Sequence, residues 1–298
     1  MKNSIIKSSN YFYFKNIFSF KKFYSLFLVI SILTISCSKE ENNPDEKWEF
    51  TKIVNIATDN NGYMKTLDFY QKKGNEWRIV RMEPDDYTKF YLKEIITPDE
   101  YMLPIKNENA FMTCDAELFD PETNKIHTQN KIKWIEGSPV LFNATLNFNN
   151  VFTDISPAFN TINKFSGATY SYEKAYDNND KTQTYMLYDF PNQKYLYYGF
   201  RDGADLLLSY PLSDLCVNAN KIDWKNIDAV TCTNDKDNES LYYFFDFDAQ
   251  KMYILNRINK NTNNPSFTFD TYNVYNFAEN FKGKSGTAEE NAPFDFSK

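Results

Sequence analysis

Residues 184–194 read TYMLYDFPNQK and residues 241–251 read LYYFFDFDAQK, and the two segments align without a gap at an offset of 57 residues, 241 minus 184. Tyrosine, aspartate, phenylalanine, glutamine and lysine coincide in the two copies. Each copy has a mostly apolar run, a short segment typical of a turn, and a lysine that opens a second aromatic run. The pattern predicts a β-hairpin that occurs at least twice.

An upstream strand precedes each hairpin, at residues 168–175 and 229–233, and each ends in a cluster of Asn and Asp residues. Two fainter copies lie earlier in the chain. The aspartates that correspond in the four copies are Asp68, Asp120, Asp189 and Asp246. Repeated units of this size, with three or four strands each, predict the blades of a β-propeller, whose faces pack against neighbouring blades.

Tyr, Phe, Ile, Val and Thr cluster in short runs between Asn, Asp, Gly and Pro throughout the chain, which predicts a mainly β fold. Only brief segments, such as residues 212–219, are compatible with a helical turn. We therefore favour a four-bladed propeller over residues 48–276, with residues 277–298 as a polar C-terminal tail. A pair of two-sheet β-sandwich domains is the alternative.

The most regular unit comprises WKNIDAV (224–230), YYFF (242–245) and QKMYI (250–254). It resembles a repeat of the hemopexin family, in which an inner strand lines a central tunnel and an aromatic hairpin builds the outer strands. The family glycine is missing from the hairpin turn. The resemblance implies that Asp228 lies beside the tunnel, where family members hold ions through backbone carbonyls.

The N-terminal residues have the composition of a targeting segment. Residues 1–22 contain five lysines and no acid, and residues 23–35 form an apolar run. Thirteen helical residues span about 20 Å, less than the roughly 30 Å hydrocarbon core of a bilayer. This length favours a signal sequence over a permanent transmembrane helix.

The run ends at Thr34-Ile35-Ser36-Cys37, which resembles the lipobox of bacterial lipoproteins, although Thr34 replaces the usual leucine. The resemblance implies that diacylglycerol is attached to the Cys37 thiol and that residues 1–36 are removed. A secretory signal or a membrane anchor with an incidental cysteine is the alternative.

Residues 38–43, SKEENN, resemble the acidic tag that directs lipoproteins of the Bacteroidetes group to the cell surface. The resemblance implies an outer-membrane lipoprotein that faces the medium. Residues 37–47 are expected to be a lipidated, flexible tether, because residues 38–45 are polar and poor in apolar residues.

Loss of residues 1–36 removes five of 33 basic residues and none of 40 acidic ones, which leaves a net charge of 28 − 40 = −12. A surface of this charge repels phosphate backbones, so we expect no nucleic-acid partner. Aromatic residues make up 18% of the chain, enough for a large core.

Three cysteines follow the anchor, Cys114, Cys216 and Cys232. An oxidising compartment permits one disulfide. We consider Cys216 and Cys232 the favoured pair, and three reduced thiols equally compatible with the sequence. Their spacing does not resemble a zinc site.

Residue patterns for catalysis are scarce. His127 is the single histidine and is expected to be exposed and structural. No nucleophile elbow or phosphate loop occurs, so no catalytic residue, metal ligand or cofactor is assigned. Paired carboxylates of a glycan hydrolase are compatible with the composition.

Two other patterns have a structural and a functional reading. The Asp/Asn cluster 235–239 is favoured as turn chemistry, with a structural calcium or other ion as the alternative. The four tryptophans are favoured as core residues over sugar-stacking platforms: Trp48, Trp77, Trp134 and Trp224.

The sequence thus leads to three functional hypotheses. The first is a surface binding module, not an enzyme, that recognises a host protein, a glycan or a haem-type nutrient. The second is an envelope glycan hydrolase with paired carboxylates. The third is an accessory subunit of a surface complex.

Overall fold

The computed structural model describes most of the chain from Glu46 onward. The described residues are 46–59, 63–100, 102–112, 117–128, 144–147, 165–174, 181–201, 204–234, 240–256 and 271–298. Lys47–Lys298 form one compact unit. All the sheets described below belong to this unit.

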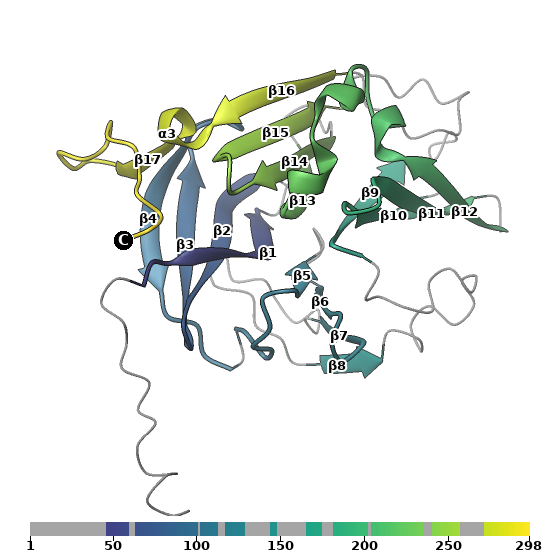
Figure 1. Ribbon diagram of the computed structural model, residues 1–298, viewed down its shortest axis with the longest axis horizontal. Coiled ribbons are helices and arrows are strands. Elements are labelled where there is room, and N and C mark those ends of the chain that lie inside the picture. The colour runs from purple at the N-terminus through teal and green to yellow at the C-terminus, as the bar shows by residue number, and fades with distance from the viewer. Residues whose placement is uncertain are drawn as a thin grey trace, which may run out of the picture. The chain divides into compact units, whose positions relative to one another are not determined.

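The strands form four sheets, here called blades 1 to 4 in chain order (Figure 1). Within each blade, successive strands pair antiparallel. Blade 1 contains β1 (Glu49–Thr58), β2 (Met64–Lys73), β3 (Glu76–Pro84) and β4 (Phe90–Ile96). Blade 2 contains β5 (Phe111–Met112), β6 (Leu118–Asp120), β7 (Lys125–Thr128) and β8 (Ala144–Asn147). Blade 3 contains β9 (Gly167–Lys174), β10 (Lys181–Asp189), β11 (Lys194–Arg201) and β12 (Ala204–Pro211). Blade 4 contains β13 (Ala229–Asn234), β14 (Ser240–Asp246), β15 (Lys251–Asn256) and β16 (Thr271–Asn276).

The first strands of the blades form a ring. β1 contacts β5, β5 contacts β9, β9 contacts β13, and β13 contacts β1. This cyclic order makes them the inner strands of a four-bladed β-propeller, so the prediction from the sequence repeats is confirmed. The mainly β class is confirmed as well.

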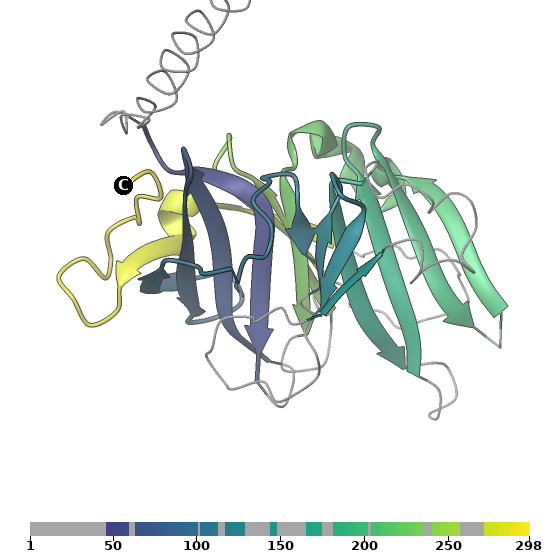
Figure 2. The ribbon, with the colours of Figure 1, turned by 90° about the horizontal axis from the view of Figure 1, so that it is seen from below.

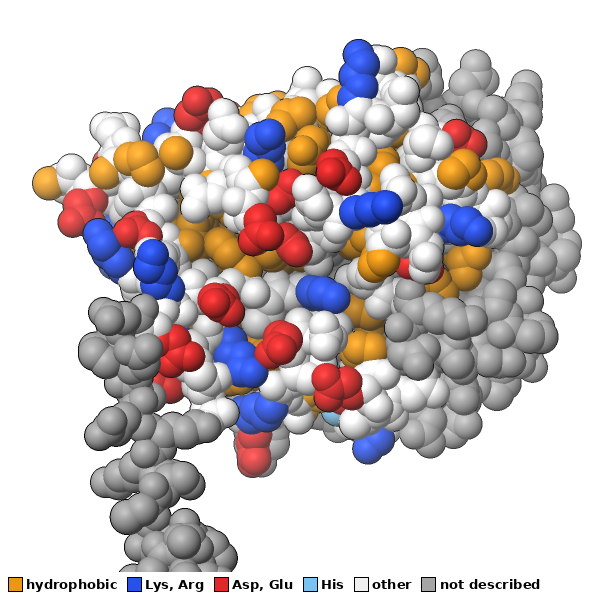
Figure 3. All heavy atoms as spheres, in the orientation of Figure 1, with side chains coloured by type: hydrophobic (Ala, Val, Ile, Leu, Met, Phe, Trp, Pro, Cys, Tyr) orange, Lys and Arg blue, Asp and Glu red, His pale blue; other side chains and the backbone are white. Residues whose placement is uncertain are grey.

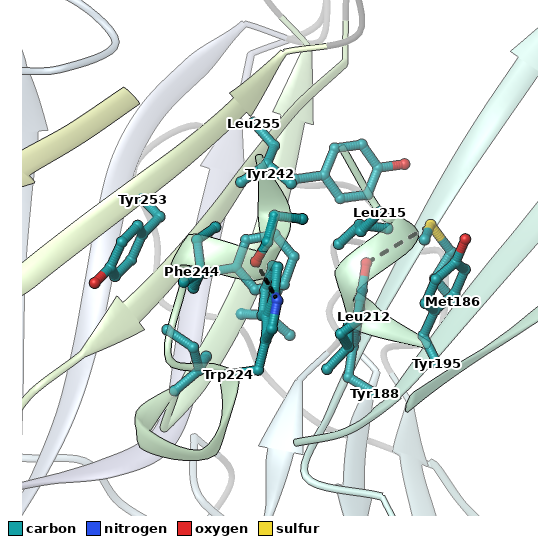
Figure 4. Close-up of a cluster of buried hydrophobic side chains, with 14 of the residues drawn as sticks. Met186, Tyr188, Tyr195, Leu212, Leu215, Trp224, Tyr242, Phe244, Tyr253 and Leu255 are labelled. Atoms are coloured by element: carbon teal, nitrogen blue, oxygen red, sulfur yellow. Dashed lines mark hydrogen bonds between the residues drawn. The ribbon is translucent and has the colours of Figure 1, made fainter. Parts of the chain in front are cut away.

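Packing between blades explains why the repeat is apolar at consecutive positions. On β14, Tyr242 and Phe244 belong to the cluster shared with blade 3, whereas Tyr243 and Phe245 belong to the cluster shared with blade 1. Side chains of a strand alternate between its two faces, and here both faces are buried. A third cluster lies between blades 1 and 2. Short 3₁₀ turns cover the junction of blades 3 and 4, namely η3 (Leu212–Asp214), η4 (Ala219–Lys221) and η5 (Trp224–Asn226) (Figure 4).

The aspartates of the repeat have one structural role in three blades. The Asp246 carboxylate accepts a hydrogen bond from the Ala249 N–H (2.8 Å), and Asp189 accepts one from the Asn192 N–H (3.2 Å). Asp120 accepts two such bonds in the corresponding turn of blade 2. Each turn places a residue with positive φ directly before the next strand: Asn124 (57°), Gln193 (53°) and Gln250 (50°).

The β14–β15 turn is the one that lacks the glycine of the hemopexin pattern. The left-handed region favours glycine, but Gln250 adopts it here. Blade 1 does not share this turn, in which an aspartate caps the hairpin and a residue with positive φ precedes the next strand. Asp68 lies within β2, away from the turn, and the β2–β3 turn is a shorter one with Gly74 at φ 55°.

The C-terminal segment completes blade 1, which corrects the expectation of a polar tail at residues 277–298. After the short helix α3 (Phe277–Asn280), β17 (Phe281–Lys284) pairs parallel with β4 as a fifth strand (Figure 2). Phe281 and Phe296 are buried in the cluster between blades 1 and 4. We call residues 277–298 the C-terminal latch.

Hydrogen bonds hold the end of the latch against blade 1. The Phe296 carbonyl oxygen accepts bonds from Gln71 Nε2 (3.0 Å) and Arg78 Nη2 (2.8 Å), and Arg78 Nη1 donates to the Lys298 oxygen (2.6 Å). The backbone N–H of Trp48, just before β1, donates to the backbone carbonyl oxygen of Ser297 (3.4 Å). The first and last described segments of the unit therefore meet at one place.

Candidate functional site

Cys37 and the leader lie outside the described residues, as do the tag and tether up to residue 45. The lipidation site therefore stays a prediction from the sequence. Within the described part of the chain, no helix has the length and apolar character needed to cross a membrane.

Asp228, the position that the hemopexin resemblance places beside the tunnel, directly precedes inner strand β13. Its N–H donates to the Phe245 oxygen (2.8 Å), and its Oδ2 accepts a bond from the Phe247 N–H (2.9 Å). The carboxylate thus caps the β14–β15 turn. In blade 3, Ser166 takes the corresponding place, with its N–H bonded to the Tyr188 oxygen (2.7 Å).

The surroundings of Asp228 shift its ionisation. Burial raises the pKa of this half-buried carboxyl, and the nearby charges of Asp248 and Asp246 raise it further. The hydrogen bond from Phe247 and the charge of Lys52 act in the opposite direction. Among the residues that the structure describes, no three His, Cys, Asp or Glu side chains converge as a metal site would require. The cluster 235–239 lies outside these residues.

A second polar group, which sequence analysis missed, crosses blade 1 in a single register row. Asn55 of β1 pairs with Asp68 of β2, Asp68 with Arg81 of β3, and Arg81 with Glu94 of β4. The row extends from the inner strand β1 to β4. We call these four residues the blade-1 polar row.

Arg81 is the centre of the row. Its Nε and Nη2 donate to the two oxygens of Asp68 (2.9 and 2.8 Å), and its Nη1 donates to Glu94 (3.1 Å). The Asp68 and Arg81 side chains are each only 1% exposed, whereas Glu94 is 48% exposed. Burial raises the pKa of the Asp68 carboxyl, and the hydrogen bonds from Arg81 oppose this effect. Two oxygens facing one guanidinium fork are the geometry of a strong ion pair.

Unpaired polar atoms lie beside this ion pair. Asn55 is fully buried, and in the structure neither its Oδ1 nor its Nδ2 has a hydrogen-bond partner. The Tyr70 hydroxyl on the same face of β2 is also buried without one. An unpaired buried group costs about 1–3 kcal/mol, so water or a small polar group is expected to bind here. In the sequence, this ion pair could have been recognised from Asp68 and Arg81, each of which is a charged residue in a mostly apolar strand segment.

His127 is buried, which corrects the expectation of an exposed histidine. It lies on β7 with 7% of its surface exposed, and its Nδ1 is 3.1 Å from the Thr145 hydroxyl of β8. Burial lowers its pKa. The charge of Asp120 raises this pKa and that of Lys125 lowers it further.

The cysteines also differ from the favoured pairing. Cys216 is a free, buried thiol, whereas Cys232 is disulfide-bonded. The pair Cys216–Cys232 is therefore wrong, and so is the alternative of three reduced thiols. Burial raises the pKa of the Cys216 thiol to about 12, so this residue is unreactive near neutral pH.

Two of the four tryptophans are confirmed as core residues. Trp224 is buried between blades 3 and 4 (Figure 4), with its indole N–H bonded to the Ala219 oxygen (2.9 Å). Trp77 is buried between blades 1 and 2. The half-buried Trp48 stacks against the Arg78 guanidinium, 4.4 Å from the ring centroid. Trp134 lies outside the described residues.

On the face shown in Figure 3, acidic and basic side chains of the described residues are interspersed. No protein-family model matches the chain, and no curated protein matches it either. The resemblance to hemopexin repeats therefore stays a prediction from residues 224–254.

Proposed function

We propose that this protein is a lipoprotein anchored in the outer membrane through Cys37, and that its propeller is a surface-exposed, non-catalytic binding module. The ligand classes are those expected from the sequence: a host protein, a glycan or a haem-type molecule. The observation that carries the proposal is the leader. It consists of a basic segment and an apolar run of thirteen residues, and Cys37 follows two residues after that run.

The short stretch of chain between Cys37 and the propeller is compatible with an anchored module. Eleven residues, 38–48, separate Cys37 from the start of β1 at Glu49. At about 3.3–3.6 Å per residue, this tether reaches at most about 40 Å when fully extended. The start of the propeller would therefore stay within about 40 Å of the membrane surface.

The disulfide at Cys232 supports the extracytoplasmic part of the proposal. Disulfides persist in envelope and extracellular compartments, whereas cytosolic thiols are kept reduced. The closed ring of inner strands supports the binding role, because a rigid scaffold can present loops at both ends of the propeller.

Mass spectrometry of the mature N-terminal peptide tests the anchor. We expect an acyl-modified Cys37 as the first residue, and we expect Cys37→Ser to release the protein from the membrane fraction. Ser38→Ala is the matched control and should remain acylated. An unmodified Cys37 thiol, or a retained leader, would contradict the anchor.

The binding role needs a separate assay. The compact unit Lys47–Lys298 can be screened as a soluble protein against host proteins, glycan arrays and haem. We expect saturable binding to one of these classes. If all three screens are negative, the binding proposal is wrong, whatever the result at Cys37.

One observation favours the alternative of a glycan hydrolase. Burial raises the pKa of Asp228, as is common for carboxyls that act as general acids. In that case Asp228→Asn would abolish glycan cleavage, whereas Asp214→Asn, a change of an exposed carboxylate, would not. If the unchanged protein releases no sugar from any glycan in the screen, this alternative is refuted.

A further inference from the structure

Two buried residues of blade 1 have polar atoms that no group in the described part of the chain satisfies. They are Asn55 of β1, whose Nδ2 and Oδ1 both lack a hydrogen-bond partner, and Tyr70 of β2, whose hydroxyl lacks one. Asn55 is 0% exposed and Tyr70 is 1% exposed, so bulk solvent does not reach them. Folded proteins pair almost all buried polar groups, either within the chain or with ordered water. These three atoms therefore point to a bound partner from outside the chain.

Strand register brings the three atoms to one side of blade 1. Asn55 lies directly opposite Asp68, and Tyr70 follows Asp68 by two residues, so the three side chains share one face of the sheet. Directly opposed Cβ atoms are about 4.5–5.5 Å apart, and diagonal neighbours are at most about 7–8 Å apart. Burial raises the pKa of the Tyr70 hydroxyl, the Asp68 charge raises it further, and the Arg81 charge lowers it. The amide and the hydroxyl thus border the same ion pair.

The chemistry of this place selects an uncharged partner that both donates and accepts hydrogen bonds. Asn55 Nδ2 needs an acceptor, Asn55 Oδ1 needs a donor, and the Tyr70 hydroxyl can act as either. The buried charges of Asp68 and Arg81 already compensate each other through two hydrogen bonds. An ion would add an uncompensated charge where burial is costly. Water meets these requirements, and a buried water typically makes about three hydrogen bonds to such groups.

The face that carries Asn55 and Tyr70 is turned towards blade 2. Tyr70 belongs to the cluster that also contains Leu118 of blade 2. The opposite wall of this junction has an unpaired polar atom as well. His127 lies opposite Leu118 and therefore on the same face of blade 2, and its buried Nε2 lacks a partner among the described residues. Both walls of the junction between blades 1 and 2 thus offer polar atoms to water.

We infer that buried water molecules occupy the junction of blades 1 and 2, where Asn55 and Tyr70 hold them beside the Asp68–Arg81 ion pair. Water at this place completes the hydrogen bonding of Asn55. It also solvates the buried charges, which lowers the cost of keeping them inside the blade. These waters are part of the fold, and they exchange with solvent only when the two blades separate locally. The inference goes beyond the proposed function and is independent of the lipid anchor.

A high-resolution crystal structure of the full chain tests the inference directly. We expect ordered water within hydrogen-bond distance of an Asn55 amide atom and of the Tyr70 oxygen. A crystal held under xenon pressure should show no xenon there, because xenon enters dry apolar cavities. Bound xenon, a larger molecule, or a side chain of the protein that fills this place would each overturn the inference.

Two conservative variants test the inference in solution. Tyr70→Phe removes one oxygen, and Asn55→Leu replaces the amide by an apolar group of similar size. If water is bound, each change deprives a water of one partner, and we expect the melting temperature of the full chain to fall by about 2–4 °C. If the atoms are unpaired, each change removes a buried polar group without a partner. The melting temperature would then stay the same or rise, and the inference would be wrong.

Asn291→Leu provides the matched control, because Asn291 is exposed in the C-terminal latch, and it should leave the melting temperature unchanged. Should Asn55→Leu fail to fold, the smaller change Tyr70→Phe and the crystal structure decide the question.

Discussion

Replacement of one member of the Asp68–Arg81 ion pair should destabilise the propeller far more than replacement of both. Both side chains are 1% exposed and share two hydrogen bonds of 2.8 and 2.9 Å. In Asp68→Leu the Arg81 charge stays buried and loses both hydrogen bonds to the Asp68 carboxylate, while its bond to the half-exposed Glu94 can remain. Removal of one partner of a buried pair costs about 3–5 kcal/mol, so we expect a loss of this size.

The double variant Asp68→Leu/Arg81→Met removes both buried charges and keeps apolar volume in their place. Such replacements are often neutral, or stabilising by about 1–4 kcal/mol. The expected coupling between the two sites is therefore several kcal/mol. The assay is equilibrium urea unfolding of the unit Lys47–Lys298, with the two single variants and the double variant as a mutant cycle.

The exposed pair Lys93–Glu83, 3.5 Å apart, provides the matched control. Lys93→Ala should change the free energy of unfolding by less than about 1 kcal/mol, because solvent screens this pair. If Asp68→Leu costs no more than this control, or if the double variant loses the sum of the two single losses, our account of the blade-1 polar row is wrong.

Three further predictions concern the ionisation of His127, a turn and the C-terminal latch. Burial lowers the pKa of His127 below its unfolded value near 6.5, so the unfolded chain binds more protons and stability should fall as pH decreases through 6.5. His127→Gln should reduce this dependence, and a melting-temperature profile between about pH 5 and 8 that matches the unchanged protein would contradict it. Gln250→Gly should stabilise the fold by about 0.5–1 kcal/mol by relieving its positive φ, whereas Ala249→Gly should not, as measured by urea unfolding. Phe296→Ala removes a buried ring of the latch and should cost about 3–5 kcal/mol in the same assay; a loss below about 1 kcal/mol would show that the latch contributes little.

The sequence was most informative where a repeat encoded a repeated structure. Asp120, Asp189 and Asp246 each cap a hairpin turn, and a local turn with its two strands can be recognised from about ten residues. Asp68 shows the limit of this reasoning. It matched the repeat by residue type, but its carboxylate pairs with Arg81 because β3 places a guanidinium opposite it.

Long-range contacts account for the errors. Residues 277–298 are rich in polar side chains, yet Phe281 and Phe296 are buried because blades 1 and 4 supply an aromatic cluster for them. Cys216 and Cys232 are the two cysteines closest in sequence after the leader, yet the Cys216 thiol is free and buried in the cluster between blades 3 and 4. Asp228 was singled out from its repeat, but its role as a turn cap depends on the Phe247 N–H, which lies 19 residues further along the chain.

The bond from Trp48 to Ser297 has a mechanical consequence for an anchored protein. In the proposed lipid-anchored protein, tension transmitted through residues 38–47 would enter the fold at Trp48, whose backbone N–H is bonded to Ser297 near the far end of the chain. Load is therefore shared between β1 and the C-terminal latch from the outset. A protein cut before residue 277 would lack this bond, and the force would then act on β1 alone.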